Sequence, residues 1–408
     1  VVLMAGLPGV SESEGFDRSD LHLPEQQERL IEAVCAANPR TVVALSNGAP
    51  VVMPWVEHPA AIVESYLGGQ ASGAALVDVL FGDANPGGRL AETFPVTQLD
   101  VPSDRWFPGS PHQVEYREGL MVGYRSYTTT GVQPLFPFGH GLSYTSFQYG
   151  PATIDREKIT AGKSVLVTVP VTNTGNRVGS DVVQVYVHDR SEVVQRPRRE
   201  LRGFAKVRLD PGETTSVTIT LGERAFAFYD TDEAGWRIPS GPFDIEVARS
   251  SADIDQVLSV TVARGVRTAP TDPSSPMIAA SDDEFRARLG HYIPTPRPVR
   301  PFTRLSTIGE IQSTVLGRAI KSGLKRYSAP DPATIAENDP ALATLLERGL
   351  DELPLRAVAL FGQGQLSWPV VDTVIDLLNG RPVPAVTRSL SALATGTGRQ
   401  LRRLLPGR

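Results

Sequence analysis

The densest cluster of reactive side chains lies near the start of the chain. Residues 11–20 read Ser-Glu-Ser-Glu-Gly-Phe-Asp-Arg-Ser-Asp and hold four carboxylates and one guanidinium group. Neighbouring carboxylates and partial burial both raise the pKa of a carboxyl, which suits it to work as a general acid. Glu14 is the best candidate, because Gly15 lets the backbone turn tightly and Phe16 lowers the local polarity. A solvated acidic turn is the alternative interpretation of the same residues.

Residue types that serve other chemistries are scattered. The six histidines include no pair at the spacing of metal ligands, and Cys35, the single cysteine, has no partner for a disulfide or a zinc site. No Gly-x-Ser-x-Gly elbow occurs, and the Gly-Gly-Gln sequence at 68–70 lacks the lysine of a phosphate-binding loop. We therefore expect no metal and no cofactor. Cys35 is expected to be a small buried hydrophobic residue, and 68–70 a tight packing turn.

The acidic cluster lies in a loop that follows an apolar run, and the pattern around it predicts alternating strands and helices. The predicted elements are a strand at 1–5, a helix from Pro24 through Ala37, strands at 41–45 and 61–66, and a helix at 73–81. Such an alternation indicates a parallel sheet, whose ligands bind beyond the carboxyl ends of the strands. The loop at 6–24 is long for a link of this kind, which is typical of functional loops.

Aromatic residues are also dense in this first part of the chain. Sugar rings bind by their apolar faces against aromatic side chains, but core packing explains such residues equally well. Only an aromatic residue that lines a crevice would support a sugar site. The residues concerned are Trp55, Tyr66, Trp106, Phe107, Tyr116, Tyr124 and Tyr127.

The hydrophobic pattern divides the 408 residues into three parts. Residues 1–148 predict an α/β sandwich with a mostly parallel sheet. Residues 149–265 alternate with a period of two between turn signals, as at Val165, Val167 and Val169, which predicts a β-sandwich. Residues 266–408 begin with a proline-rich connector and continue as a mainly helical extension. Its helices are expected at 308–325, 341–350 and 370–378.

Composition excludes several classes of partner. The net charge of −5 and the lack of a basic cluster interleaved with aromatic residues argue against nucleic acid. No apolar run approaches the roughly 18 residues that span a bilayer, so we expect a soluble protein of bacterial type. The chain begins with Val1 inside a predicted strand, which we interpret as a piece cut at its N-terminus. Cytoplasmic and secreted locations both stay open, as does a homodimer.

Ordered motifs in the first two parts resemble glycoside hydrolase family 3, the β-glucosidase family. Residues 1–148 resemble its C-terminal α/β sandwich, and 149–265 resemble its fibronectin type III-like module. The motifs in the first part are 13–18 (SEGFDR), 46–51 (SNGAPV), 82–90 (GDANPGGRL), 116–125 (YREGLMVGYR) and 136–145 (FPFGHGLSYT). Those in the second are 171–175 (VTNTG), 183–187 (VQVYV) and 199–204 (RELRGF).

The resemblance implies a reaction and assigns residues to it. Family members hydrolyse terminal β-D-glucosidic bonds with retention, through a covalent glycosyl-enzyme and two carboxyl groups about 5 to 5.5 Å apart. The glutamate of the Glu-Gly-(Phe/Tyr)-Asp-Arg segment is their general acid and base, and it corresponds to Glu14. Phe16, Asp17 and Arg18 are then expected to shape the substrate site, the last two by orienting the loop. Glu12 shares the loop but lacks the adjoining glycine.

The resemblance also places the nucleophile elsewhere. In the family, the nucleophilic aspartate lies in a Ser-Asp-Trp segment of an N-terminal (β/α)8 barrel, and no such tripeptide occurs here. Ser19-Asp20 and Ser103-Asp104 are poor substitutes. We therefore expect a fragment of a β-glucosidase-like enzyme that is inactive alone. The alternatives are a barrel-free carbohydrate-binding or scaffolding protein, and a family member with β-xylosidase or other β-glycosidase specificity.

Overall fold

The described residues divide into two compact units. The first covers Val1–Gly6, Asp20–Phe107 and Glu115–Pro294, and the second combines Leu7–Ser19 and Pro108–Val114 with the helices after Thr295. Within the described part of the chain, no helix is long and apolar enough to cross a membrane. The computed structural model describes residues 1–12, 17–109, 113–191, 193–267, 277–296, 298–327, 340–361 and 367–382, together with 384 and 387.

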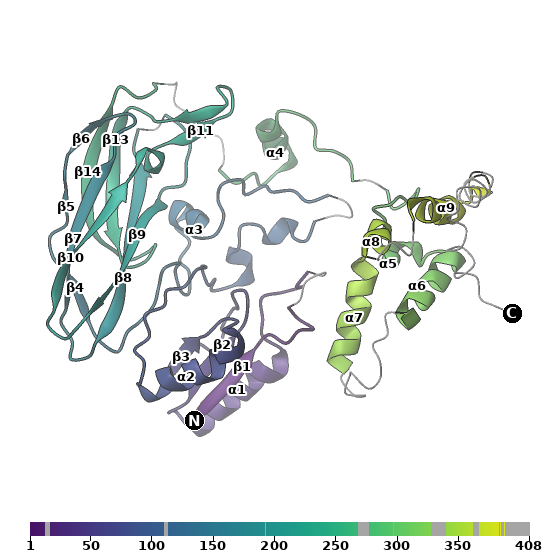
Figure 1. The fold of residues 1–408 in the computed structure, drawn as a ribbon, viewed down its shortest axis with the longest axis horizontal. Coiled ribbons are helices and arrows are strands. Elements are labelled where there is room, and N and C mark those ends of the chain that lie inside the picture. The colour runs from purple at the N-terminus through teal and green to yellow at the C-terminus, as the bar shows by residue number, and fades with distance from the viewer. Residues whose placement is uncertain are drawn as a thin grey trace. The chain divides into compact units, whose positions relative to one another are not determined.

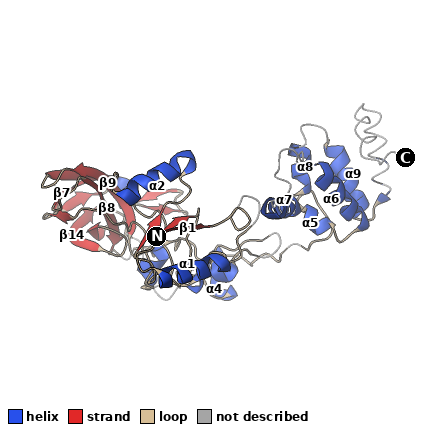
Figure 2. Ribbon diagram, turned by 90° about the horizontal axis from the view of Figure 1, so that it is seen from below, coloured by secondary structure: helices blue, strands red, loops and turns tan. Residues whose placement is uncertain are grey.

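Three parallel strands form the sheet of the α/β domain, in the order β1-β2-β3. Val42 lies beside Val2 on one side and Ala61 on the other, so the three carboxyl ends meet at one edge. Figure 2 shows this sheet between helices α1 and α2. The predicted parallel sheet is confirmed, and Cys35 is buried on α1 as expected. The bounds are β1 (Val2–Gly6), α1 (Glu25–Ala37), β2 (Val42–Ser46), β3 (Ala61–Glu64) and α2 (Ser72–Phe81).

Short helices and loops complete the α/β domain. Gly68 packs so tightly against the start of α2 that an added Cβ would lie 2.7 Å from Ser72 Oγ, which confirms the expected packing turn. Phe94 and Phe136 form an isolated backbone bridge, and their rings meet edge to face with centroids 6.4 Å apart. The short elements are η1 (Gly69–Ala71), η2 (Gln98–Asp100), η3 (Asp104–Trp106) and α3 (Tyr124–Thr130).

The next part of the chain is the predicted β-sandwich (Figure 1). One sheet has the order β10-β7-β4, with β5 also paired to β7, and the other has the order β6-β14-β13-β8-β9. Inward side chains of both sheets form a single apolar core, because alternate residues of each strand point to the same face. A separate ribbon pairs β11 with β12.

The bounds of these elements follow the predicted period-two segments. They are β4 (Phe147–Tyr149), β5 (Thr153–Ile154), β6 (Lys158–Thr160), β7 (Val165–Asn173), β8 (Gly179–Asp189), β9 (Glu200–Leu209), β10 (Thr214–Leu221), η4 (Glu223–Ala225), β11 (Phe228–Asp230), β12 (Gly235–Arg237), β13 (Gly241–Ala248) and β14 (Ile254–Ala263).

The connector after the sandwich contains a helix that the sequence reasoning missed. Helix α4 (Asp282–Leu289) begins at Ser281, whose side chain accepts from the Glu284 N–H, while the Glu284 carboxylate accepts from the Ser281 N–H. This Ser-x-x-Glu capping box was the available signal. The helix belongs to the first compact unit, although the proline-rich composition had suggested a poorly structured link.

The second unit contains the helical extension. The single helix expected at 308–325 is wrong, because the chain forms two helices there. The Thr314 side chain accepts from the Gly317 N–H at 2.9 Å and caps the second helix, and an added Cβ on Gly317 would lie 1.9 Å from the Ile311 carbonyl. Phe302, Ile308, Ile311, Leu355, Val371 and Leu378 form the core. The helices are α5 (Ile308–Ile311), α6 (Val315–Tyr327), α7 (Pro340–Glu352), α8 (Leu355–Phe361) and α9 (Trp368–Leu378).

Candidate active site

The carboxyl edge of the parallel sheet is where the sequence predicts the site. Gly6 ends β1 and Ser46 ends β2, and the two backbones approach so closely that an added Cβ on Gly6 would lie 2.0 Å from the Ser46 carbonyl oxygen. Gly6 is therefore required by space rather than by its backbone angles. The loop that carries the predicted acid starts directly after this contact.

The first stem of that loop is fixed by a side chain of helix α1. The Gln27 amide accepts a hydrogen bond from the Gly6 N–H at 2.8 Å and donates one to the Gly6 carbonyl at 2.9 Å. A strand end whose backbone groups are both satisfied is held in place where the sheet ladder stops. The sequence reasoning missed Gln27, since a glutamine on a helix gives no signal of its long-range partner.

The second stem of the loop, at Leu21, is held by two hydrogen bonds of its backbone groups. The Leu21 N–H donates to Gln98 Oε1 at 3.2 Å, and the Leu21 carbonyl accepts from the Val52 N–H at 2.9 Å. Asp20 accepts from the His22 N–H at 2.9 Å. The Gln98 amide in turn donates to Asp104 Oδ1 at 2.6 Å. Asp20 and Asp104, weighed above as substitutes for a nucleophile, thus hold local backbone and side-chain groups.

A second polar group of the edge joins the ends of β2 and β3. Asn47 is fully buried, and its amide donates to Glu64 Oε2 at 3.2 Å and to the Ala49 carbonyl at 3.0 Å. The other oxygen of Glu64 accepts from the Tyr66 N–H at 2.8 Å. Ser46 Oγ donates to the Tyr66 carbonyl at 3.1 Å. The Glu64 carboxylate is therefore used to position backbone.

Tyr66 has an unusual conformation and environment at this edge. Its φ of 48° is in the left-handed region, where a bulky residue is strained and needs surrounding support. Burial, followed by the charges of Glu64 and Glu92, raises the pKa of Tyr66 to about 12. The phenol therefore stays protonated at neutral pH. Sequence reasoning singled out Tyr66 only as an aromatic residue and missed Glu64.

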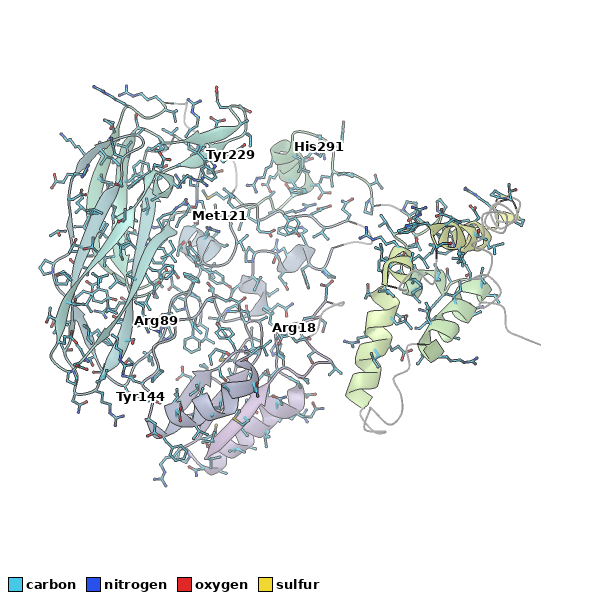
Figure 3. All side chains as sticks on the ribbon, viewed as in Figure 1. Arg18, Arg89, Met121, Tyr144, Tyr229 and His291 are labelled. Carbon is cyan, nitrogen blue, oxygen red and sulfur yellow. The ribbon has the colours of Figure 1, made fainter. Side chains whose placement is uncertain are left out.

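The predicted catalytic residues fall partly outside the described residues. Glu14 and Phe16 lie there. Asp17 is exposed and Arg18 is partly buried in the loop that leads back to the α/β domain (Figure 3). Glu12 is partly buried, and its backbone N–H donates a hydrogen bond to the Pro8 carbonyl at 3.1 Å. The four site assignments stay predictions.

The aromatic residues of the α/β domain separate into two groups. Trp55 and Tyr127 are buried, and core packing accounts for them. Tyr124 stacks on Phe138 with ring centroids 4.8 Å apart. Tyr116 and Phe107 are exposed. Burial therefore supports core packing for Trp55 and Tyr127. The exposed Tyr116 and Phe107 stay open to either interpretation, core packing or sugar binding.

Comparison with known proteins places this geometry in a family. Residues 1–144 match the Glycosyl hydrolase family 3 C-terminal domain, and residues 181–251 match the Fibronectin type III-like domain. The chain belongs to glycoside hydrolase family 3. The resemblance drawn from the motifs is confirmed, as are the α/β domain, the fibronectin type III-like sandwich and the helical C-terminal region.

Curated relatives of this family 3 chain are glycoside hydrolases. It is 41% identical to the thermostable beta-glucosidase B of Acetivibrio thermocellus, over 93% of this chain and 46% of that protein. It is also 41% identical to an exo-alpha-(1->6)-L-arabinopyranosidase of Bifidobacterium breve, over 71% of this chain and 38% of that protein. The chain thus spans less than half the length of these relatives.

Solved structures give the same result. The crystal structure of the GH3 beta-glucosidase of Bifidobacterium adolescentis matches with a TM-score of 0.62 and 38% identity, over 78% of this chain and 42% of that one. DesR, a beta-glucosidase of Streptomyces venezuelae solved with D-glucose, matches with a TM-score of 0.59 and 38% identity, over 64% and 33% of the two chains.

Proposed function

We propose that this chain supplies the acid/base half of a retaining β-glucosidase, with the Glu14 carboxyl as the general acid and base. One observation carries the proposal: the Ser-Glu-Gly-Phe-Asp-Arg segment at 13–18 lies in the loop that leaves the carboxyl end of β1, where the ligands of parallel sheets bind. The nucleophilic aspartate comes from the family's (β/α)8 barrel, outside these 408 residues. The beta-glucosidases among the relatives support this assignment.

The proposed reaction divides the work between two carboxyl groups. Glu14 protonates the departing glycosidic oxygen while the nucleophile attacks the anomeric carbon, and it then removes a proton from the water that releases the sugar. Phe16 lowers the local polarity, which keeps the acid protonated for the first step. Asp17 and Arg18 orient the loop. The fixed stems at Gly6 and Leu21 support the proposal, since both ends of a loop that positions an acid must be rigid.

The direct test restores the missing half. We would fuse the chain to the N-terminal portion of the Acetivibrio thermocellus relative that it does not match, and assay p-nitrophenyl β-D-glucoside. Glu14→Gln should lower kcat/KM by roughly 10²- to 10⁴-fold, and Glu12→Gln should leave it near the parent value. The loss should shrink for a dinitrophenyl leaving group, which departs without protonation. Equal losses in both variants would contradict the assignment.

The unfused chain provides a second test. It should release no nitrophenol, because the double displacement has no nucleophile. Turnover by the purified 408-residue chain that disappears in Glu14→Gln would overturn the proposed division of labour. Binding of a glucoside with no turnover in the fusion as well would favour the carbohydrate-binding or scaffolding alternative.

A second sugar specificity is a defined alternative. Relatives that are 41% and 40% identical are named exo-alpha-(1->6)-L-arabinopyranosidases. The residues that select the sugar lie mostly in the barrel under our proposal, so Glu14 serves the same role for any substrate. Comparing kcat/KM of the native protein for nitrophenyl β-D-glucoside, β-D-xyloside and α-L-arabinopyranoside decides among them, and a preference for a pentoside would replace the β-glucosidase assignment.

A further inference from the structure

An aromatic pair projects from the β-sandwich on the ribbon of β11 and β12. Tyr229 and Trp236 face each other in register across the two strands, with ring centroids 5.4 Å apart and an interplanar angle of 71°. Tyr229 is 50% exposed and Trp236 is 49% exposed. Figure 3 labels Tyr229 on this ribbon. Half-exposed rings of this size leave a contiguous apolar surface in water.

A guanidinium group completes the surface. Arg224 lies in η4, just before β11, with its Cζ 3.3 Å from the centroid of the Trp236 ring. It is exposed, and the described residues place no carboxylate within ion-pair distance of it. When a guanidinium group stacks on an aromatic ring, its N–H donors point outward in the guanidinium plane and can bind an acceptor of a ligand. We call Arg224, Tyr229 and Trp236 the ribbon platform.

Packing against the sandwich core explains the residues at the base of the ribbon, but it does not explain why the platform residues are exposed. Phe226, two residues before β11, is fully buried and meets Phe243 edge to face at 5.4 Å. Ala225 and Ala227 are buried beside it. These residues anchor the ribbon to the core. The cross-strand contact of the platform adds little to ribbon stability and leaves about half of each ring exposed to water.

The chemistry of the platform selects a class of ligand. Aromatic faces take up the apolar C–H faces of pyranose rings, and guanidinium donors bind sugar hydroxyl oxygens. The segment 223–237 carries four carboxylates against two guanidinium groups, so a polyanion would be repelled. We propose that the ribbon platform is an auxiliary binding site for a neutral glycan chain. The ribbon platform shares no residue with the loop proposed for hydrolysis and needs no catalytic residue.

Affinity electrophoresis of the full 408-residue chain tests the proposal, with soluble barley β-glucan as the probe in the gel. The native chain should be retarded, and Trp236→Ala should weaken retardation by roughly tenfold. Trp236→Phe keeps an aromatic face and should fall between the two. Tyr292→Ala is the matched control, because Tyr292 is 81% exposed and also has an arginine, Arg286, over its ring at 5.6 Å. It should migrate like the native chain.

Three outcomes would overturn the proposal. They are no retardation of the native chain, equal retardation of Trp236→Ala, and stronger retardation by dextran sulfate than by the neutral glucan. Thermal melting of each variant checks that the sandwich is folded, and the Trp236→Phe variant keeps the test valid if Trp236→Ala melts early. Glu14→Gln should bind like the native chain, so failure of the proposed hydrolysis and failure of the platform give different results.

Discussion

The guanidinium of Arg89 in the α/β domain, which is labelled in Figure 3, pairs with the carboxylate of Asp181 in β8 of the sandwich. Asp181 is 1% exposed, and its second oxygen accepts from the Tyr149 hydroxyl at 2.9 Å. Arg89 also donates to the Gly141 carbonyl. Burial, followed by the Asp181 charge, raises the pKa of Tyr149, so its hydroxyl remains a donor. The joint between the two domains therefore rests on an ion pair whose carboxylate is buried and has partners on both of its oxygens.

Removing one charge from this joint should be costly. Asp181→Asn leaves the Arg89 guanidinium buried without its counter-charge, and we expect a loss of about 3 to 5 kcal/mol in the free energy of unfolding. Urea denaturation measures it. Asp283→Asn is the control, because Asp283 pairs with Arg286 on the surface and should cost less than about 1 kcal/mol. Similar losses in both variants would refute a special role for the joint.

Arg117 should hold helix α4 against the α/β domain. Its side chain is buried, pairs with Asp282 at 2.5 Å and with Glu115 at 2.6 Å, and lies 5.0 Å from the ring centre of Phe285. Arg117→Ala should expose residues 279–290 to hydrogen exchange and proteolysis. Arg117→Lys should rescue this only in part, since an ammonium group lacks the planar fork.

The surface arginine of the same helix provides the control. Arg286→Ala removes an exposed pair with Asp283 and should leave the exchange of 279–290 nearly unchanged. If the Arg117→Ala and native chains exchange alike across this helix, Arg117 does not hold it. Hydrogen exchange followed by mass spectrometry, on peptides that cover residues 279–290, gives the measurement.

The stability of the sandwich should depend on pH through Glu200. Burial raises the pKa of Glu200, but Arg196 at 2.6 Å and Arg202 at 2.9 Å outweigh it, and the pKa is lowered from 4.5. A lowered pKa means that the stabilisation is present above about pH 4.5. It is lost as the pH falls through the folded-state value.

Glu200→Gln should therefore destabilise the chain most at neutral pH, by roughly 3 kcal/mol, with a difference that shrinks below pH 4.5. Free energies of unfolding from pH 3 to 7 test this. Glu233→Gln, at an exposed ion pair with Arg237, should follow the native curve. A Glu200→Gln difference that is constant with pH would show that the ion pairs do not set the stability.

The close approach between the ends of β1 and β2 should leave no room for a side chain at Gly6. Gly6→Ala places a methyl group 2.0 Å from the Ser46 carbonyl oxygen, so the strands must separate, and we expect a loss of roughly 2 kcal/mol or more. Gly73→Ala is the opposite case, since nothing lies within 4 Å of its Cβ position in α2. It should stabilise by about 0.5 to 1 kcal/mol. Chemical denaturation compares the two, and equal effects would contradict the close approach.

Local patterns were enough to predict most elements. The period of two in β7 and the apolar runs of β1 and β2 report burial directly, because strand geometry alternates side chains whatever the partner is. Side-chain caps at Ser281 and Thr314 account for the two differences between the predicted and the observed helices after the sandwich. A cap acts through one side chain and leaves the hydrophobic pattern nearly unchanged.

The sequence by itself determined the family, the order of the domains and the acidic loop with Glu14, since these depend on residue types in contiguous segments. Only the tertiary structure decided which residues hold the ends of that loop and which aromatic residues remain exposed. Gln27 reaches Gly6, Arg89 reaches Asp181, and Trp236 stays half exposed beside Tyr229. The first two contacts join residues far apart in the chain, and the exposure of a side chain such as Trp236 depends on what packs over it. No local pattern encodes either property.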